Sequence, residues 1–570
     1  MDIQRTGLLG ILGILTYVLF LQWNIFTEAK NSTADTTATQ NKTALSTSEI
    51  PPAPENSAST ASTASTASTA STDDEVLPTN PPINDDFIVV ETPTVNITIA
   101  LTGGDITQLL LKDYPVSLKD PGQPIALLDN TSRTYVAQSG LVGPDGPDAS
   151  ENGRPLYKAD QQQFIIDKPT DISIQAETDT GLIVTKTFSI APNQYDLKVT
   201  HKIKNVSQTV KTLSPFVQLK RDNSEDPSTQ NSMGMQAFLG YALRTADERY
   251  RKVSFSDFEN ATDARELNTE LKNASTTGGY LALLQHYFTS AWVPSSTETH
   301  LYSFRTNKNG HFIGSIVGPS ITLGPGETEQ TSSTLYAGPK DQETLEMLTP
   351  GLELVVDYGW LWFIAQPLFW LLKFIHTYVG NWGFAIILLT ILVKAAFFQL
   401  SAAAYKSMAK MRKFTPEINR MRELHGDDRQ RMSKEMMDLY KREKINPLGG
   451  CLPILVQMPV FIALYWVLLE SVELRQAPFV FWINDLSVKD PYFILPLIMG
   501  VSMYIQTSLN PTPPDPMQAK IMKYMPVAFT FFFLWFPAGL VLYWVINNIL
   551  SIAQQWVITK SIEKADTQTS

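Results

Sequence analysis

The chain has 570 residues and a formal net charge of −11, an acidic balance that argues against DNA as a partner because phosphate binding needs a basic face. Its single cysteine, Cys451, excludes an internal disulfide, and six scattered histidines give no cluster at metal-ligand spacing, so we expect no metal and no cofactor. The length and the sharp changes of composition predict more than one domain.

The first segment, residues 1–26, contains the apolar run GLLGILGILTYVLFLQW after a short polar start. A run of this length is either a cleaved signal peptide or a membrane anchor. The nearest pair of small residues, Thr27 and Ala29, makes a poor cleavage site. We therefore expect a retained N-terminal anchor.

Residues 27–83 consist mainly of Ser, Thr, Ala, Asn and Pro with a tandem AST repeat, and this composition predicts a disordered linker because it has too little apolar surface to bury. Residues 84–350 instead contain short alternating runs such as VNITIAL, QFIID and LIVTKTFSI between turn-forming residues. Such runs indicate a β-rich domain, most simply a two-sheet sandwich. The domain lacks catalytic signatures such as GxSxG or HExxH, which favours binding or scaffolding over an enzyme.

Hydrophobicity rises abruptly after Pro350. Apolar segments occur at about 354–374, 381–403, 451–470, 491–510 and 521–559. The last is too long for one span, and Pro537 and Gly539 are expected to divide it into two helices joined by a tight turn. The first, within residues 351–376, carries polar residues among many aromatics, which is typical of a helix lying in the membrane interface; a spanning helix is the alternative.

The distribution of basic residues predicts the topology. The loop 404–446 is rich in Lys and Arg, whereas the loop 472–490 contains only Arg475 and Lys489, so the first is expected to face the cytoplasm. Together with the anchor, the helical region 377–559 then gives six spans. Both termini, including a tail at 560–570, would be cytoplasmic, and the β domain would lie outside.

Lys394 lies within the apolar sequence GFAIILLTILVKAAFFQL, where a charge at mid-bilayer costs about 2.5–3.5 kcal/mol. The lysine stem could lift its ammonium to the inner headgroups. Alternatively, polar residues on several spans face a shared wet interior with it. Helical spacing adds Thr390 on the same helix, and Gln457 lies on another span. The last helix carries a second polar stripe made of Tyr543, Asn547, Ser551 and Gln554. The other interpretation of these polar residues is interhelical hydrogen bonding.

Three stretches make the family recognisable: YKSMAKMRKFTPEI, NPLGGCLPILVQMPVFIALY and FFFLWFPAGLVLYWVINNILSIAQQW. They resemble the YidC/Oxa/Alb family of membrane protein insertases over roughly the last 220 residues, and the anchor followed by a large β domain is similar to the Gram-negative layout of that family. The resemblance implies a β-supersandwich in the periplasm and a cytoplasmic helical hairpin at 404–446.

The resemblance further implies an insertase and chaperone of the inner membrane that needs no nucleotide. It would act alone or beside the Sec translocon on nascent membrane proteins delivered by the ribosome. The family has a positive residue, commonly arginine, on its second span in an intramembrane substrate groove, and the matching residue here is Lys394. Gln457 and Trp544 also match groove-lining positions, whereas Thr390, Tyr543 and Asn547 come from helical spacing.

Two other classes remain open. A transporter or channel could use the same polar helical interior for a small solute, although no internal repeat is evident. An anchored periplasmic sugar-binding protein would place its function in the sandwich. The Met-rich basic loop 404–446 suits a polypeptide client better than a small solute.

Overall fold

A computed structural model describes residues 49–52, 87–150, 153–229, 238–259, 261–273, 276–425, 428–443, 452–510 and 516–569, which all fall in one compact unit. The predicted anchor 1–26 and most of the predicted linker 27–83 lie outside these residues, as does Cys451. Four linker residues, Glu49–Pro52, are described, and they lie against the β domain.

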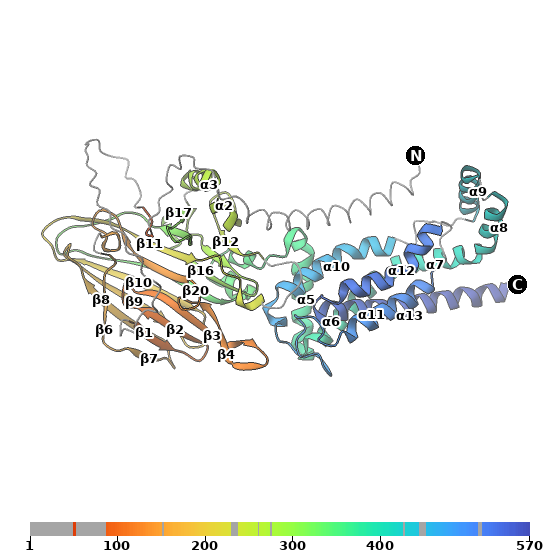
Figure 1. Ribbon diagram of the computed structural model, residues 1–570, viewed down its shortest axis with the longest axis horizontal. Coiled ribbons are helices and arrows are strands. Elements are labelled where there is room, and N and C mark those ends of the chain that lie inside the picture. The colour runs from red at the N-terminus through yellow and green to blue at the C-terminus, as the bar shows by residue number, and fades with distance from the viewer. Residues whose placement is uncertain are drawn as a thin grey trace, which may run out of the picture. The chain divides into compact units, whose positions relative to one another are not determined.

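The β domain contains two sheets (Figure 1). The larger has eleven strands in the order β14-β17-β18-β11-β5-β3-β2-β1-β7, with β19 paired to β11 and β4 to β3. Its strands are β1 (Phe87–Glu91), β2 (Val95–Ala100), β3 (Asp105–Ser117), β4 (Asp120–Leu128), β5 (Tyr135–Val142), β7 (Gln163–Ile165), β11 (Lys211–Arg221), β14 (Thr276–Thr277), β17 (Thr299–Thr306), β18 (Phe312–Val317) and β19 (Ile321–Leu323).

The smaller sheet has nine strands in the order β13-β12-β15-β16-β20-β10-β9-β8-β6. They are β6 (Lys158–Ala159), β8 (Thr170–Glu177), β9 (Leu182–Ile190), β10 (Asp196–Asn205), β12 (Gly240–Leu243), β13 (Arg251–Ser254), β15 (Leu281–Leu284), β16 (Phe288–Val293) and β20 (Thr328–Pro339). The pairs are antiparallel except for β1 with β7.

The alternating sequence produces the sandwich. Along β9, every second side chain is buried, so the strand presents one face to the core, as its sequence predicts. The inner faces of both sheets share one apolar cluster that includes Leu219 of β11 and Leu283 of β15. The indole of Trp292 on β16 also donates to the Gln218 carbonyl of β11 (3.1 Å), which links the two sheets. The predicted β-sandwich is confirmed.

Short helices border the sandwich, and a set of longer helices follows it. The short ones are η1 (Pro147–Ala149), η2 (Pro227–Thr229), α2 (Phe255–Glu259), α3 (Ala261–Asn273), α4 (Gln342–Leu348), η3 (Leu352–Val355), η4 (Gly359–Leu361) and η6 (Val472–Leu474). The longer ones are α5 (Trp362–Val379), α6 (Trp382–Ala396), α7 (Phe398–Lys413), α8 (Thr415–His425), α9 (Arg429–Arg442), α10 (Leu452–Glu470), α11 (Ile494–Ser508), α12 (Pro516–Phe533) and α13 (Ala538–Thr569).

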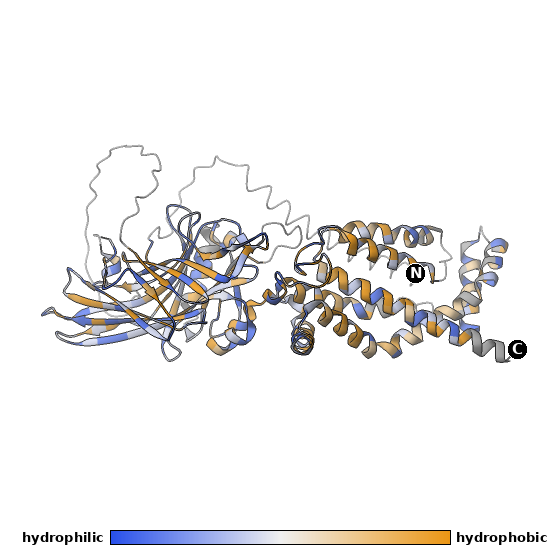
Figure 2. Ribbon diagram, turned by 90° about the horizontal axis from the view of Figure 1, so that it is seen from below, coloured by the Kyte–Doolittle hydropathy of each residue, from blue (hydrophilic) through white to orange (hydrophobic). Residues whose placement is uncertain are grey.

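Figure 2 shows long hydrophobic stretches on most of these longer helices, in contrast to the mixed colouring of the strands, whereas α8 and α9 are mainly hydrophilic. Among the described helices, only Ala538–Ile562 of α13 passes on its own as a bilayer-crossing helix by length and composition. The bent pair α6–α7 adds a second crossing if it counts as one span. The described helices therefore leave the six expected spans without confirmation.

The sequence boundaries agree with the helices in two places and differ in one. Asn381 caps α6 by accepting from the Phe384 amide (3.2 Å), and the break around Pro537 separates α12 from α13 as predicted. The expected single helix over 381–403 instead ends at Ala396, and α7 continues at an angle of 67°. The predicted tail 560–570 is helical through Thr569 because α13 continues past the apolar segment.

Candidate functional site

Lys394 occupies the last turn of α6, immediately before the bend into α7. The carbonyl groups at a helix C-terminus carry partial negative charge, which favours a cation by about 0.3–1 kcal/mol. Only 8% of the lysine surface is exposed. The bend therefore gives the ammonium partial compensation that a continuous helix would not provide.

Two neutral side chains hold the Lys394 ammonium. Its Nζ lies 2.8 Å from Ser551 Oγ on α13 and 3.4 Å from Gln457 Oε1 on α10. The Ser551 hydroxyl donates to the Asn547 carbonyl (2.7 Å), so its lone pairs are free to accept from the lysine. The Tyr405 hydroxyl of α7 also reaches Ser551. We call Lys394, Gln457, Ser551 and Tyr405 the Lys394 cluster.

The charge of Lys394 has no carboxylate partner among the described residues. This contrasts with Lys340, which is also buried but forms an ion pair with Glu470 at 2.9 Å. Burying an ammonium without a counter-charge is expensive, and neutral oxygens compensate only in part. The cluster can therefore accept an anionic group from outside it.

The structure places the remaining predicted residues around the cluster without direct contact to the ammonium. Thr390 is buried one turn before Lys394, and its hydroxyl donates to the Ile386 carbonyl (2.7 Å) of its own helix. Asn547 is buried and contributes its backbone carbonyl through Ser551. Tyr543 and Trp544 pack against Phe461, with ring centroids 6.3 and 5.0 Å apart.

Three helices of the same region, one of which carries Lys394, expose large apolar side chains on their outer surfaces. The exposed residues on α6, α11 and α12 include Phe384, Leu388, Ile391, Leu392, Leu497, Ile498, Val501, Tyr504, Ile521, Tyr524, Val527, Phe531 and Phe532. Apolar surface of this extent on a soluble protein would cause association, whereas lipid tails would cover it in a bilayer. Polar side chains inside the helical region and apolar side chains on its exterior are the arrangement expected of a membrane protein.

Comparison with known families covers nearly all of the described chain. Residues 87–371 match the family model described as the YidC periplasmic domain, and residues 374–565 match the model described as 60Kd inner membrane protein. A protein named membrane protein insertase YidC from Pseudomonas fluorescens SBW25 is 51% identical over 99% of both chains, and its namesake from Azotobacter vinelandii is 50% identical over the same shares.

The chain belongs to the YidC family of membrane protein insertases. Its relatives are inner membrane proteins with a periplasmic domain, and the β-sandwich is that domain. A solved structure of an active YidC insertase aligns with a TM-score of 0.37 and 19% identity over 82% of this chain and 92% of that one. The relatives' names favour an insertase over the small-solute transporter and the sugar-binding protein.

Sequence reasoning missed one member of the Lys394 cluster in this YidC-family chain, Tyr405. Ser551 lies one helical turn after Asn547, on the polar stripe that helical spacing predicts for the last helix. Tyr405 had no usable signal, because its approach to Ser551 depends on the bend between α6 and α7. Helical periodicity continued through this bend would put Tyr405 on the same face as Lys394 but about three turns away, so it would not predict the contact with Ser551.

Proposed function

We propose that the protein inserts membrane proteins by drawing an acidic or polar tail of the client to the Lys394 cluster while the client's apolar segment enters lipid. The observation that carries this proposal is the buried ammonium, which contacts the neutral atoms Ser551 Oγ and Gln457 Oε1. In this mechanism Thr390, Tyr543, Trp544 and Asn547 line the same groove and shape its wall.

The attraction between Lys394 and a client carboxylate is comparable in free energy to the cost of bringing that carboxylate into the membrane. Two opposite unit charges at 4 Å attract by about 4 kcal/mol at an effective dielectric constant of 20, which offsets the cost of bringing a carboxylate into the membrane. Burial of about 20 apolar residues in lipid then drives the client forward without nucleotide. The proposal contains no covalent step, so it assigns no catalytic residue.

We also propose six spans, with both termini in the cytoplasm: the N-terminal segment, α6, α10, α11, α12 and α13. The loop between α10 and α11 and the turn between α12 and α13 pair with each other, since the Ala538 and Gly539 amides donate to the Val488 and Leu486 carbonyls at 2.7 and 2.9 Å. Arg475 of the same loop donates to the Pro115 carbonyl of the periplasmic domain (2.6 Å). Both connections therefore suit the periplasmic side.

We propose that α5 lies at the periplasmic interface of the inner membrane. Trp362, Phe363, Trp370 and Tyr378 are exposed on this helix, and aromatic side chains prefer that depth of the bilayer. Lys373 of the same helix pairs with Glu343 of α4 at 2.9 Å. An ion pair with the end of the periplasmic domain favours a helix lying beside that domain over one crossing the membrane.

We assign the partners by family resemblance. The helices α8 and α9 carry a basic surface that suits the RNA or proteins of a ribosome, and the insertase would act alone or beside the Sec translocon. Arg442 pairs with Glu417 at 3.0 Å and thereby joins α9 to α8, which supports the expected hairpin at 404–446. Residues 426–427 and 444–446 of that hairpin lie outside the described ones.

Insertion into reconstituted vesicles tests the role of Lys394. The clients are a pair with the same apolar segment and a translocated tail that contains either Asp or Asn at the same positions. We expect Lys394→Met to reduce insertion of the Asp client about tenfold, equivalent to about 1.4 kcal/mol, with little change for the Asn client. Lys394→Arg should retain both activities because it keeps the charge.

Lys373→Met is the matched control, because it removes a lysine of α5 that lies outside the cluster. Equal insertion of both clients by Lys394→Met and the wild type would refute the charge mechanism. Photo-crosslinkers at Gln457 and Trp544 should also capture a stalled client segment. Capture of lipid alone at both positions would contradict the assigned groove.

A further inference from the structure

A short segment of the N-terminal linker occupies a site on the periplasmic domain. Glu49–Pro52 contacts the outer face of the eleven-stranded sheet, where β11, β17 and β18 lie side by side. On β11, Val217 and Leu219 belong to the sandwich core, whereas the alternate residues Phe216 and Gln218 face the segment. The linker is thus held well before the first strand.

The backbone carbonyl of Glu49 accepts two hydrogen bonds from buried side chains. Gln218 Nε2 donates at 3.0 Å and Arg305 Nη2 at 2.9 Å, and these residues are 0% and 3% exposed. The Gln218 Oε1 accepts from Arg305 Nη2 (2.5 Å) and from Ser315 Oγ (3.2 Å). Exchanging the oxygen and nitrogen of this amide by a 180° rotation would break both hydrogen bonds. The donors are therefore oriented in advance toward the carbonyl.

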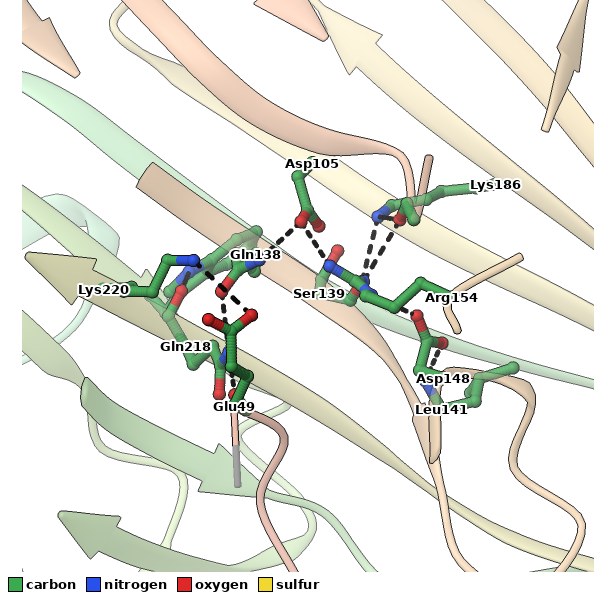
Figure 3. Close-up of polar contacts among 12 residues, drawn as sticks. Glu49, Asp105, Gln138, Ser139, Leu141, Asp148, Arg154, Lys186, Gln218 and Lys220 are labelled. Carbon is green, nitrogen blue, oxygen red and sulfur yellow. Dashed lines mark hydrogen bonds and ion pairs between the residues drawn. The ribbon is translucent and has the colours of Figure 1, made fainter. Parts of the chain in front are cut away.

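Figure 3 shows that this site lies at the end of a row of polar side chains. Gln218 donates to Gln138 Oε1 (2.7 Å), and Gln138 donates to Asp105 Oδ2 (2.6 Å). Arg154 then bridges Asp105 and Asp148. Because each member has a partner, the row fixes the position of Gln218 from the neighbouring strand β5.

The side chains of the segment complete its recognition. The Glu49 carboxylate accepts from Asn307 Nδ2 (3.1 Å) and lies 3.8 Å from the Lys220 ammonium. Ile50 packs on an apolar patch formed by Val142, Phe216 and Val317, and Pro51 is buried. The surface thus reads a carboxylate, a backbone carbonyl and an apolar side chain in consecutive positions.

The sequence Glu-Ile-Pro-Pro suits such docking physically. Proline lacks a backbone N–H, so Pro51 can be buried without needing an acceptor. A residue before proline is restricted to extended conformations, which lowers the entropy lost by Ile50 on binding. Because the segment is tethered to its own site, a contact that would be weak between separate molecules suffices here.

We propose that Glu49–Pro52 is a built-in ligand of the periplasmic domain, which attaches the chain to the domain well before its first strand. With this attachment at Glu49 instead of Phe87, 22 residues rather than 60 separate the predicted anchor 1–26 from its first contact with the domain. The docked segment thereby shortens the stretch of chain that connects the two.

Cleavage by a glutamate-specific protease tests the docking in the full-length protein in vesicles or detergent. The linker contains the matched sequences Glu49–Ile50 and Glu75–Val76. Each cleavage rate is normalised to the rate at the same site in the denatured chain. We expect cleavage after Glu49 to be about tenfold slower than after Glu75, because the protease acts on the undocked population.

Ile50→Ser should raise the normalised rate at Glu49 to that at Glu75, and Val76→Ser, the matched control, should leave the ratio unchanged. Both substitutions lie in the linker, so neither can unfold the sandwich core. Lys220→Ala should give an intermediate rate at Glu49 because it removes only the longer charge contact. Equal normalised rates at Glu49 and Glu75 in the wild type, or no response to Ile50→Ser, would overturn the proposal.

Discussion

The Lys340 ammonium lies 2.9 Å from the Glu470 carboxylate, and each side chain is only 3% exposed. Lys340 follows the last strand of the periplasmic domain, and Glu470 ends α10. A ring nitrogen of His286 also lies 2.8 Å from the Leu469 carbonyl beside this pair. The sandwich and the helical region are thus joined through buried polar contacts.

Replacing one member of the Lys340–Glu470 pair should destabilise the protein more than replacing both. Lys340→Met or Glu470→Met leaves one buried charge without a partner and should cost about 3–5 kcal/mol, whereas the double variant should regain most of this loss. Unfolding monitored in detergent measures the three free energies. The exposed pair Arg251–Glu270 is the control, with an expected coupling below about 1 kcal/mol. A double variant no better than the worse single variant would contradict the prediction.

A carboxylate installed beside Lys394 should neutralise it in place. Ser551 Oγ lies closer to the ammonium than Gln457 Oε1 does, so Ser551→Asp should form an internal ion pair. Insertion of Asp-tailed clients should then fall about tenfold while the protein stays folded, because the charge is already satisfied. Ser508→Asp adds the same charge at an exposed site of α11 and should have little effect. Undiminished insertion by Ser551→Asp would count against a charge-based groove.

The stability of the protein should depend on the ionisation of Glu473, in the loop after α10. Burial, with a smaller contribution from the nearby charge of Asp341, raises the pKa of this carboxyl from 4.5 to about 7. Between these values the folded state binds more protons than the unfolded chain, so stability falls as the pH rises from about 4.5 to 7. The loss should be no more than about 3 kcal/mol.

Thermal unfolding in detergent at a series of pH values from 4.5 to 8 measures this dependence. Glu473→Gln should flatten the profile over this window, and Glu177→Gln, at an exposed strand position, should leave it unchanged. An identical pH profile for Glu473→Gln and the wild type would exclude this group as the cause.

A methyl group added at Gly383 should loosen the contact between α6 and the loop that follows α10. A Cβ at this position would overlap the ring of Phe479, so Gly383→Ala should destabilise the protein by about 1–3 kcal/mol. Adding Phe479→Ala should relieve the overlap and recover part of the loss. Gly122→Ala, where a Cβ meets no atom within 4 Å, is the control for the unfolding measurement.

Local patterns in the sequence were sufficient to predict several elements. The alternation in LIVTKTFSI gives β9 over Leu182–Ile190, and Pro537 divides the last two helices, because both features depend on neighbouring residues alone. The choice of Lys394 and Gln457 also agrees with their contact in the structure, since an isolated charge in an apolar run requires a polar partner.

Features that depend on distant residues escaped this reasoning. The bend at Phe397 has no proline or glycine to announce it, and therefore Tyr405 could not be placed near Ser551. Composition also gave no reason to single out Glu49–Pro52 within the linker, because its partners Gln218 and Arg305 come from strands much later in the chain. The buried pair Lys340–Glu470 likewise joins residues 130 positions apart.

The bend between α6 and α7 allows the two helices to move separately about a point close to Lys394. Tyr405 reaches Ser551 from α7, while the lysine belongs to α6. Since α7 leads directly into α8 and α9, a pull on that hairpin would displace the Tyr405 hydroxyl without first unwinding α6. A force on the basic hairpin would then change the polarity around the Lys394 ammonium.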